Sequence, residues 1–405
     1  MPLHDLEKTL AARVSGFEEA AILRMSRKAR KLRAQGVDIV SMTIGEPDFD
    51  TPEHIRKAAC AAMDEGWTHY APIPGQVELR AALARKLGAE NGLSYTADEI
   101  VVTNGAKQAI TNAIFSLVED GDEVILLAPF WVAYEGVIRM AGGTPVVLSS
   151  SFESNYKVSA TQIAAAMSER TKLVIINSPS NPSGIVLSAT DLRALANVIR
   201  AHPRAMVLSD EIYEYIVFDG HKAGSIGALP GMKPRTVTVN GFSKGFAMTG
   251  WRLGYAAAPP ALARAMAKMQ GAFTAGANAF VQRAAIAALE GPRDAVAAMR
   301  EAYEARRKLM MTWLTAIPGL RVHAPQGAFY VFPDVSAALA AARRRGIAHD
   351  DTGLCDWLLE RHHVATVPGS AFGTPGAIRL SFAASTEELK KGLERFATGL
   401  EELQG

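Results

Sequence analysis

One lysine in this sequence lies in surroundings that favour covalent chemistry. Lys244 stands within Asn240–Gly254, eight positions before Arg252. Glycines give this segment a deformable backbone, and its large apolar residues crowd the lysine. Burial disfavours the ammonium form of a lysine, and the neutral amine is the form that makes a Schiff base with a carbonyl carbon. The segment alone leaves open an ordinary solvated surface lysine, so other residues have to decide.

Short apolar runs between residues 100 and 257 predict the scaffold that positions this lysine. Their continuity is typical of strands buried on both faces, and they alternate with helical segments, which together predict a largely parallel α/β sheet. Such sheets bind ligands beyond the carboxyl ends of their strands. The expected strands are Ile100–Thr103, Val124–Leu127, Pro145–Leu148, Leu173–Asn177, Met206–Ser209, Val237–Asn240 and Leu253–Ala257.

The remainder of the chain is predicted to pack around this sheet. Proline positions and apolar periodicity indicate helices at about 6–35, 52–65 and 386–400, a long helical zone at 259–314, and strands at 39–45, 327–332, 364–367 and 378–382. We therefore expect an N-terminal arm with part of a small domain at 1–48, a large domain at 49–290 and a C-terminal small α+β domain at 291–405.

Composition narrows the function classes. The 405 residues include 43 basic and 41 acidic ones, a net charge of +2 that gives no reason to expect nucleic acid or an acidic membrane as partner. Cys60 and Cys355 show neither metal spacing nor a disulfide framework, and the nine histidines show no ligand spacing, so we expect no metal. Neither a signal peptide nor a membrane-spanning apolar run is apparent, which favours a cytoplasmic protein.

The segment around Lys244 resembles the cofactor-lysine motif of the class I pyridoxal-phosphate aminotransferases. The likeness rests on Ser243-Lys244, the spacing to Arg252 and the ending Arg252-Leu-Gly254, and it extends over nearly the whole chain. The stretch 247–255, Ala-Met-Thr-Gly-Trp-Arg-Leu-Gly-Tyr, is similar to the bacterial aspartate aminotransferase subgroup in particular. The resemblance implies a fold type I homodimer in which Lys244 carries pyridoxal phosphate as a Schiff base.

Two stretches are expected to bind the cofactor phosphate. Gly105, Ala106 and Lys107 follow a predicted strand and open a helix, whose N-terminal N–H groups can accept an anion. The resemblance assigns all three to a phosphate cup, with Arg252 as its fixed charge because a guanidinium binds oxyanions through two N–H groups. Ser243 is an additional donor. Lys107 could instead point at a substrate carboxylate, and the turn at Gly105 could be an ordinary strand-to-helix connection.

Four residues fit the cofactor ring. Asp210 ends a predicted strand, and a buried carboxylate beside a pyridine nitrogen keeps that nitrogen protonated, which makes the ring an electron sink. The resemblance places Asn181 and Tyr213 at the phenolic oxygen of the ring and Trp131 in a stack on its face. The plainer interpretations are a helix N-cap for Asp210, an Asn-Pro turn for Asn181 and core packing for Trp131.

The resemblance also implies a substrate site and a shared active site. Arg379 resembles the arginine that clamps the substrate α-carboxylate, and Gly45 resembles a backbone donor to the same group, with Trp131 and Asn181 beside them. A surface salt bridge is the plainer interpretation of Arg379. Tyr70 resembles a tyrosine that reaches across the dimer to the phosphate, so that two subunits would build each site.

These residues predict a transaminase. Lys244 would act as the general base that removes the Cα proton, and the amino group would pass from an L-amino acid, aspartate-like by resemblance, to a 2-oxo acid such as 2-oxoglutarate. Glu18 and Glu19 stand at the expected substrate lid, where the resemblance implies a lysine and a Pro-Ser pair. An acid that points into the entrance disfavours a second carboxylate. An aromatic, basic or neutral donor and a C–S β-lyase therefore remain alternatives. Residues 1–40 are too short and too nearly neutral for the DNA-binding module of a non-catalytic regulator.

Overall fold

The computed structural model describes residues 9–11 and 21–404 of the chain. The expected helix at 6–35 is described from its middle onward, as α2 (Ala21–Ala34). Glu18 and Glu19, on which the question of the substrate lid depends, lie outside the described residues.

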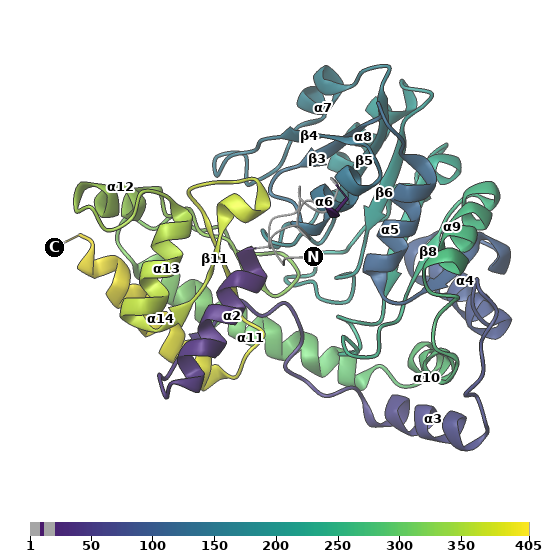
Figure 1. Cartoon of the computed structure of the whole chain (residues 1–405), viewed down its shortest axis with the longest axis horizontal. Coiled ribbons are helices and arrows are strands. Elements are labelled where there is room, and N and C mark those ends of the chain that lie inside the picture. The colour runs from purple at the N-terminus through teal and green to yellow at the C-terminus, as the bar shows by residue number, and fades with distance from the viewer. Residues whose placement is uncertain (1–8, 12–20, 405) are drawn as a thin grey trace.

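A seven-stranded sheet forms the larger part of the described chain (Figure 1). All seven predicted strands are confirmed, with ends within two residues of those expected. The strands run parallel except β8, which is antiparallel to both of its neighbours. In spatial order they are β2 (Ile100–Thr103), β8 (Gly254–Ala257), β7 (Thr236–Gly241), β6 (Met206–Asp210), β5 (Thr171–Asn177), β3 (Glu123–Leu127) and β4 (Thr144–Leu148).

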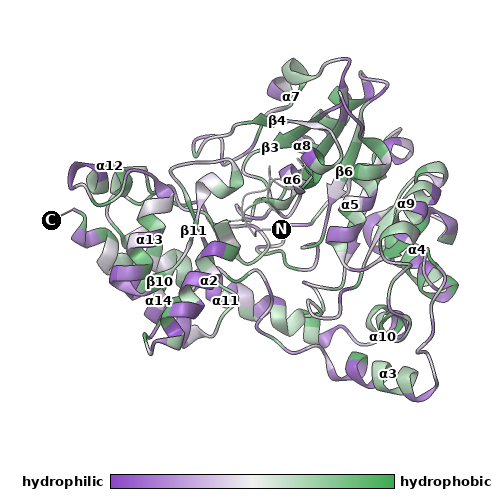
Figure 2. Cartoon of the chain, viewed as in Figure 1, coloured by the Kyte–Doolittle hydropathy of each residue, from purple (hydrophilic) through white to green (hydrophobic). Residues whose placement is uncertain are grey.

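Helices cover both faces of this sheet because its strands are apolar on both sides. Alternate residues of β3 show the division: Val124 and Leu126 belong to one apolar cluster and Ile125 to another. Figure 2 shows hydrophobic residues along the strands and mixed residues along the helices. These helices are α3 (Glu53–Asp64), α4 (Val77–Asn91), α5 (Ala106–Leu117), α6 (Ala133–Met140), α7 (Ala160–Ala166), α8 (Ala189–Arg200), α9 (Pro260–Phe273) and α10 (Ala279–Glu290).

One expectation about these elements is wrong, and a second is confirmed as helical but divides into shorter elements. The strand β4 is not buried on both faces, since it forms the edge of the sheet and all of its residues are exposed or half-buried. The helical zone at 259–314 is three helices, because the chain turns at Gly276 with a φ of +123° and again at Gly291. Asn278 then starts α10 by accepting a hydrogen bond from the backbone N–H of Val281 at 3.2 Å.

The C-terminal region packs small sheets against helices, beside the large sheet (Figure 1). The expected strand at 327–332 shortens to two residues, and the one at 364–367 divides between two sheets. The helix α11 (Asp294–Ala316) runs from the large sheet into this region. The other elements are β1 (Val40–Ser41), which pairs with β10 (Val364–Ala365), the sheet β11 (Val367–Pro368), β12 (Ile378–Ser381) and β9 (Tyr330–Val331), and the helices α12 (Ser336–Arg344), α13 (Asp351–His362) and α14 (Thr386–Glu402).

This arrangement matches the expected mixed, mostly parallel sheet with flanking helices and a smaller α+β part. The domain limits at 48/49 and 290/291 stay a prediction. Within the described ranges, no helix is long and apolar enough to cross a membrane. The same residues include no group of three or more His, Cys, Asp or Glu side chains arranged to hold a metal ion.

Candidate active site

A cavity of about 740 Å³ opens at the carboxyl ends of the parallel strands. This is the edge at which the sequence predicted a site, because parallel strands bring their last residues together there. Residues near both ends of the chain complete its wall. Eleven of the predicted site residues line this cavity: Gly45, Ala106, Lys107, Trp131, Asn181, Asp210, Tyr213, Ser243, Lys244, Arg252 and Arg379.

Lys244 lies on the cavity wall and is not an ordinary surface lysine. It follows β7 and is partly buried, and its Nζ donates a hydrogen bond to the backbone oxygen of Gly45. Burial lowers the pKa of Lys244 to about 8, opposed first by the nearby charge of Glu46. A substantial fraction of this amine is therefore neutral near physiological pH, and a neutral amine is the nucleophilic form.

Asp210 is a buried carboxylate at the end of β6. The Tyr134 hydroxyl donates to its Oδ2 at 2.6 Å, and the Ile212 N–H donates to its Oδ1 at 3.3 Å. Burial raises the pKa of Asp210 to about 6, although these two donors and the charge of Lys244 favour the ionised form. A cationic ring nitrogen in the cavity would relieve that cost.

Sequence reasoning missed Tyr134 and Tyr330. Tyr134 lies on α6 one turn after Trp131, and the two rings meet edge to face at 5.4 Å. That spacing of three was the available signal. Tyr330 lies on β9, and its hydroxyl is 2.9 Å from the hydroxyl of Tyr213. Burial raises the pKa of Tyr213 well above its ordinary value, so this hydroxyl keeps its proton and can donate it to a ligand oxygen.

Arg379 is 1% exposed, which rules out a surface salt bridge. Its Nη1 donates to Oδ1 of Asn181 at 3.0 Å and its Nη2 donates to the backbone oxygen of Thr43 at 2.7 Å. Within the described part of the chain, its Nε has no hydrogen-bond partner and its guanidinium forms no ion pair. The Cζ atom of the Arg379 guanidinium lies 4.4 Å from the centre of the Tyr330 ring. A buried cation without a counterion is costly, so the site fits an anionic ligand such as a carboxylate.

The start of α5 and Arg252 lie close together and form a cradle in the same cavity. Gly105 has a φ of +85°, and a Cβ built there would lie 2.6 Å from Nη2 of Arg252. A Cβ at Gly254 would lie 2.4 Å from the backbone nitrogen of Ala106. The helix has no side-chain cap, so its first N–H groups remain for an anion. Ser243 lines the same wall.

The side chain of Lys107 lines the cavity, whereas Tyr70 lies outside it. Nζ of Lys107 lies 5.0 Å from the centre of the Trp131 ring, and burial, together with the charge of Arg252, lowers its pKa. Among the described residues it forms no ion pair. Tyr70 is 95% exposed and lines a separate groove with Trp67 and Thr274, so one chain does not bring it to the cavity.

The family model for "Aminotransferase class I and II" matches residues 37–396. The chain belongs to this family. The aspartate aminotransferase of Rhizobium meliloti (strain 1021) is 42% identical over 395 residues, which cover 97% of this chain and 96% of that protein. The aspartate/prephenate aminotransferase of Cereibacter sphaeroides is 41% identical, over 98% of this chain and 99% of its own. The solved structure of aspartate aminotransferase from Thermus thermophilus with maleate superposes with a TM-score of 0.90 and 42% identity, covering 96% of this chain and 99% of that one.

The cofactor of this aminotransferase family is pyridoxal 5′-phosphate, and the cavity fits it. The cradle at Gly105 and Arg252 has the charge and the free N–H groups for a phosphate. Asp210 has the buried negative charge that a protonated ring nitrogen needs, and Lys244 has the amine for the covalent bond. The sheet architecture is that of the fold type I aminotransferases.

Proposed function

We propose that this aminotransferase moves the amino group of an aspartate-like L-amino acid to a 2-oxo acid such as 2-oxoglutarate. The observation that carries the proposal is the buried guanidinium of Arg379, which has no counterion among the described residues and lines the same cavity as Lys244. It would bind the α-carboxylate that donor and acceptor share. The relatives named aspartate aminotransferase support the donor, and the Thermus thermophilus structure holds maleate, a dicarboxylate.

The residues divide the work as follows. Pyridoxal phosphate, when bound, supplies an electron-withdrawing ring that acidifies the Cα–H bond of the amino acid. Asp210 holds a proton at the pyridine nitrogen, and Tyr134 fixes the orientation of Asp210. Arg379 orients the amino acid through its carboxylate, so that its Cα–H bond is directed at the amine. Lys244 Nζ then removes the Cα proton as the general base.

We infer that Lys107 binds the side-chain carboxylate of the substrate. Its Nζ lines the cavity without a counterion among the described residues, and the indole of Trp131 supports it. The Lys107→Gln variant should lose roughly 10–100-fold in kcat/KM for aspartate, because a charge-assisted hydrogen bond contributes about 1.5–3 kcal/mol. For alanine and phenylalanine, kcat/KM should stay within about threefold.

Lys222→Gln, an exposed lysine outside the cavity, is the matched control for that measurement. If Lys107→Gln weakens every donor equally and also lowers the affinity for pyridoxal phosphate, Lys107 belongs to the phosphate cup instead. Both alternatives stated from the sequence are thereby separated by one variant.

The overall proposal is tested by adding single amino acids to the cofactor-loaded protein without an acceptor. Aspartate should convert the visible absorbance band of the Lys244-bound cofactor to the near-ultraviolet band of its amine form, and 2-oxoglutarate should restore it. A shift by aromatic, basic or neutral amino acids in place of aspartate would replace the donor. Pyruvate and ammonia released from cystathionine would identify a C–S β-lyase.

We also propose a cytoplasmic homodimer whose partner subunit supplies Tyr70 to the phosphate. The support is the exposure of this tyrosine beside a groove of about 660 Å³ that also contains Asn104, next to the phosphate cradle. A molar mass in solution of one chain, 43.3 kDa, would contradict the dimer.

A further inference from the structure

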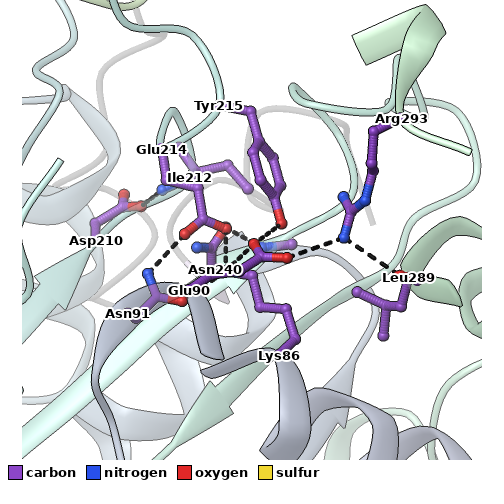
Figure 3. Close-up of polar contacts among 11 residues, drawn as sticks. Lys86, Glu90, Asn91, Asp210, Ile212, Glu214, Tyr215, Asn240, Leu289 and Arg293 are labelled. Carbon is purple, nitrogen blue, oxygen red and sulfur yellow. Dashed lines mark hydrogen bonds and ion pairs between the residues drawn. The ribbon is translucent and has the colours of Figure 1, made fainter. Parts of the chain in front are cut away.

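Figure 3 shows a network of charged residues, in which the side chains of Lys86 and Glu214 are buried and none of the ion pairs lines the cavity. The side chains of Lys86 on α4 and Glu214 after β6 are 4% and 7% exposed, and they form an ion pair through Nζ and Oε1. Asn91 forms a hydrogen bond with each partner. Its Oδ1 accepts from Nζ of Lys86 at 2.8 Å, and its Nδ2 donates to Oε2 of Glu214 at 2.7 Å. None of these three residues lines the cavity.

The network continues towards solvent through a second ion pair. Glu90 accepts from the Tyr215 hydroxyl at 2.5 Å and from Arg293, at the start of α11, at 3.1 Å. The two pairs are linked, because Nζ of Lys86 also lies 3.7 Å from Oε2 of Glu90. Together they contain two cationic and two anionic side chains. A buried ion pair adds little net stability compared with apolar side chains of similar volume, so stability alone does not account for the first pair.

The segment that ends at Glu214 carries two residues of the active site. Asp210 and Tyr213 lie four and one positions before it. Within the segment, the backbone N–H of Glu214 donates to the backbone oxygen of Glu211 at 3.0 Å. The backbone N–H of Glu211 donates to the backbone oxygen of Val239 on β7 at 2.9 Å. Both carboxylate oxygens of Glu214 are held by α4, so this turn is held by residues that do not line the cavity.

The same network contacts the residues that follow Lys244. The Tyr215 ring lies against Gly245, where an added Cβ would be 2.4 Å from its Cδ2. It also meets the Phe246 ring edge to face at 5.5 Å, and the guanidinium of Arg293 lies 5.0 Å from the centre of that ring. The network therefore supports the turn that carries Asp210 and Tyr213 and the turn that carries Lys244.

We propose that the Lys86–Glu214 pair and its partners are positioning residues for the reaction, which hold Asp210 and Tyr213 in register with Lys244. This inference rests on the proposed function, in which these three side chains act on one cofactor. Removing the pair should therefore lower kcat per bound cofactor. The KM for the amino donor should hardly change, because Arg379 lies on β12 and, within the described residues, forms no hydrogen bond or ion pair with the network.

The test is a double-variant series on the full, cofactor-loaded enzyme. Lys86→Met alone should lower Tm, since it leaves the buried Glu214 carboxylate without its cation. Glu214→Met alone should also lower Tm, since it leaves Lys86 with only the more distant Glu90, 3.7 Å away, as counterion. The double variant Lys86→Met/Glu214→Met leaves no uncompensated charge and should regain most of that Tm. Its kcat per bound cofactor should nevertheless stay roughly 10–100-fold down, because small misplacements of reacting groups cost about that much. The pH midpoint of its visible cofactor band should be shifted.

The preceding residue of the same helix provides a matched control for removing an ion pair. Arg85 pairs with Glu290 at 2.6 Å, with both side chains more than half exposed. The variant Arg85→Met/Glu290→Met should leave Tm, the band midpoint and kcat unchanged. A Lys86→Met/Glu214→Met variant that regains Tm, midpoint and kcat together would show a structural pair only and overturn the inference.

Measuring the pH midpoint of the cofactor band requires no substrate, so this measurement tests the inference even if aspartate is not the donor. A wild-type protein with a normal band and no transamination would defeat the proposed function alone. Absence of any cofactor band in the wild type would defeat both.

Discussion

Replacing Lys244 by alanine should abolish multiple-turnover transamination. The variant loses the amine that bonds to the cofactor and the general base that moves the Cα proton, and a general base alone accounts for roughly 10²–10⁴-fold in rate. The burial that lowers the pKa of Lys244 to about 8 makes this amine fit for both roles. Steady-state formation of glutamate from aspartate and 2-oxoglutarate measures the loss.

The decisive control is a lysine outside the cavity, and Lys222→Ala should keep wild-type turnover. Lys244→Ala should also remain folded, because Lys244 contributes one hydrogen bond, to Gly45, and no ion pair among the described residues. Sustained turnover by folded, cofactor-loaded Lys244→Ala would refute its assignment as the catalytic lysine.

Replacing Asp210 by asparagine should move activity and stability in opposite directions. The asparagine cannot keep a pyridine nitrogen protonated, so kcat/KM should fall by roughly 10²–10³-fold, in line with the loss of a preorganised electrostatic group. The cofactor-free protein should become more stable at pH 7. Burial raises the pKa of Asp210 from 3.8 to about 6, and a difference of this size corresponds to roughly 3 kcal/mol of unfolding free energy.

The sign of this effect fixes its pH window. Because the pKa of Asp210 is raised in the folded state, the stability from its neutral form is complete below pH 3.8 and is lost as the pH rises through about 6. Urea unfolding of the cofactor-free proteins should therefore show a gap in favour of Asp210→Asn that grows between pH 4 and pH 7. The exposed Asp64→Asn should show no such gap. Equal pH profiles for wild type and Asp210→Asn would contradict the raised pKa.

Much of the cavity could be predicted because its residues follow strand ends, where short motifs stay local in sequence. Asp210 directly ends β6, and Lys244 follows β7 within three residues. The strands themselves were recognisable from continuous apolar runs. The run at β4 was misjudged, because the place of a strand at the edge of a sheet depends on the order of strands in space. Pro145 was the one local signal, since proline within a strand is typical of an edge.

The supports behind the motifs could not be predicted in this way. Tyr134 reaches Asp210 across 76 positions, and Lys86 reaches Glu214 across 128. A tyrosine in an apolar stretch is typical of core packing, and a lysine on a helix is typical of a solvated face. Their roles depend on which elements the folded chain brings together, and no local pattern in one sequence specifies that.

The hydrogen bond between Arg379 and Thr43 joins residues 336 positions apart, and this separation orders events during synthesis. The predicted cofactor contacts within one chain, from Gly105 to Arg252, have all left the ribosome well before Arg379 is translated, and chains are made from the N-terminus. Arg379, like the partner strand of β1 at Val364, comes late in the chain. In the proposed function, the residues that contact the cofactor within one chain are therefore synthesised before the arginine that binds the amino acid.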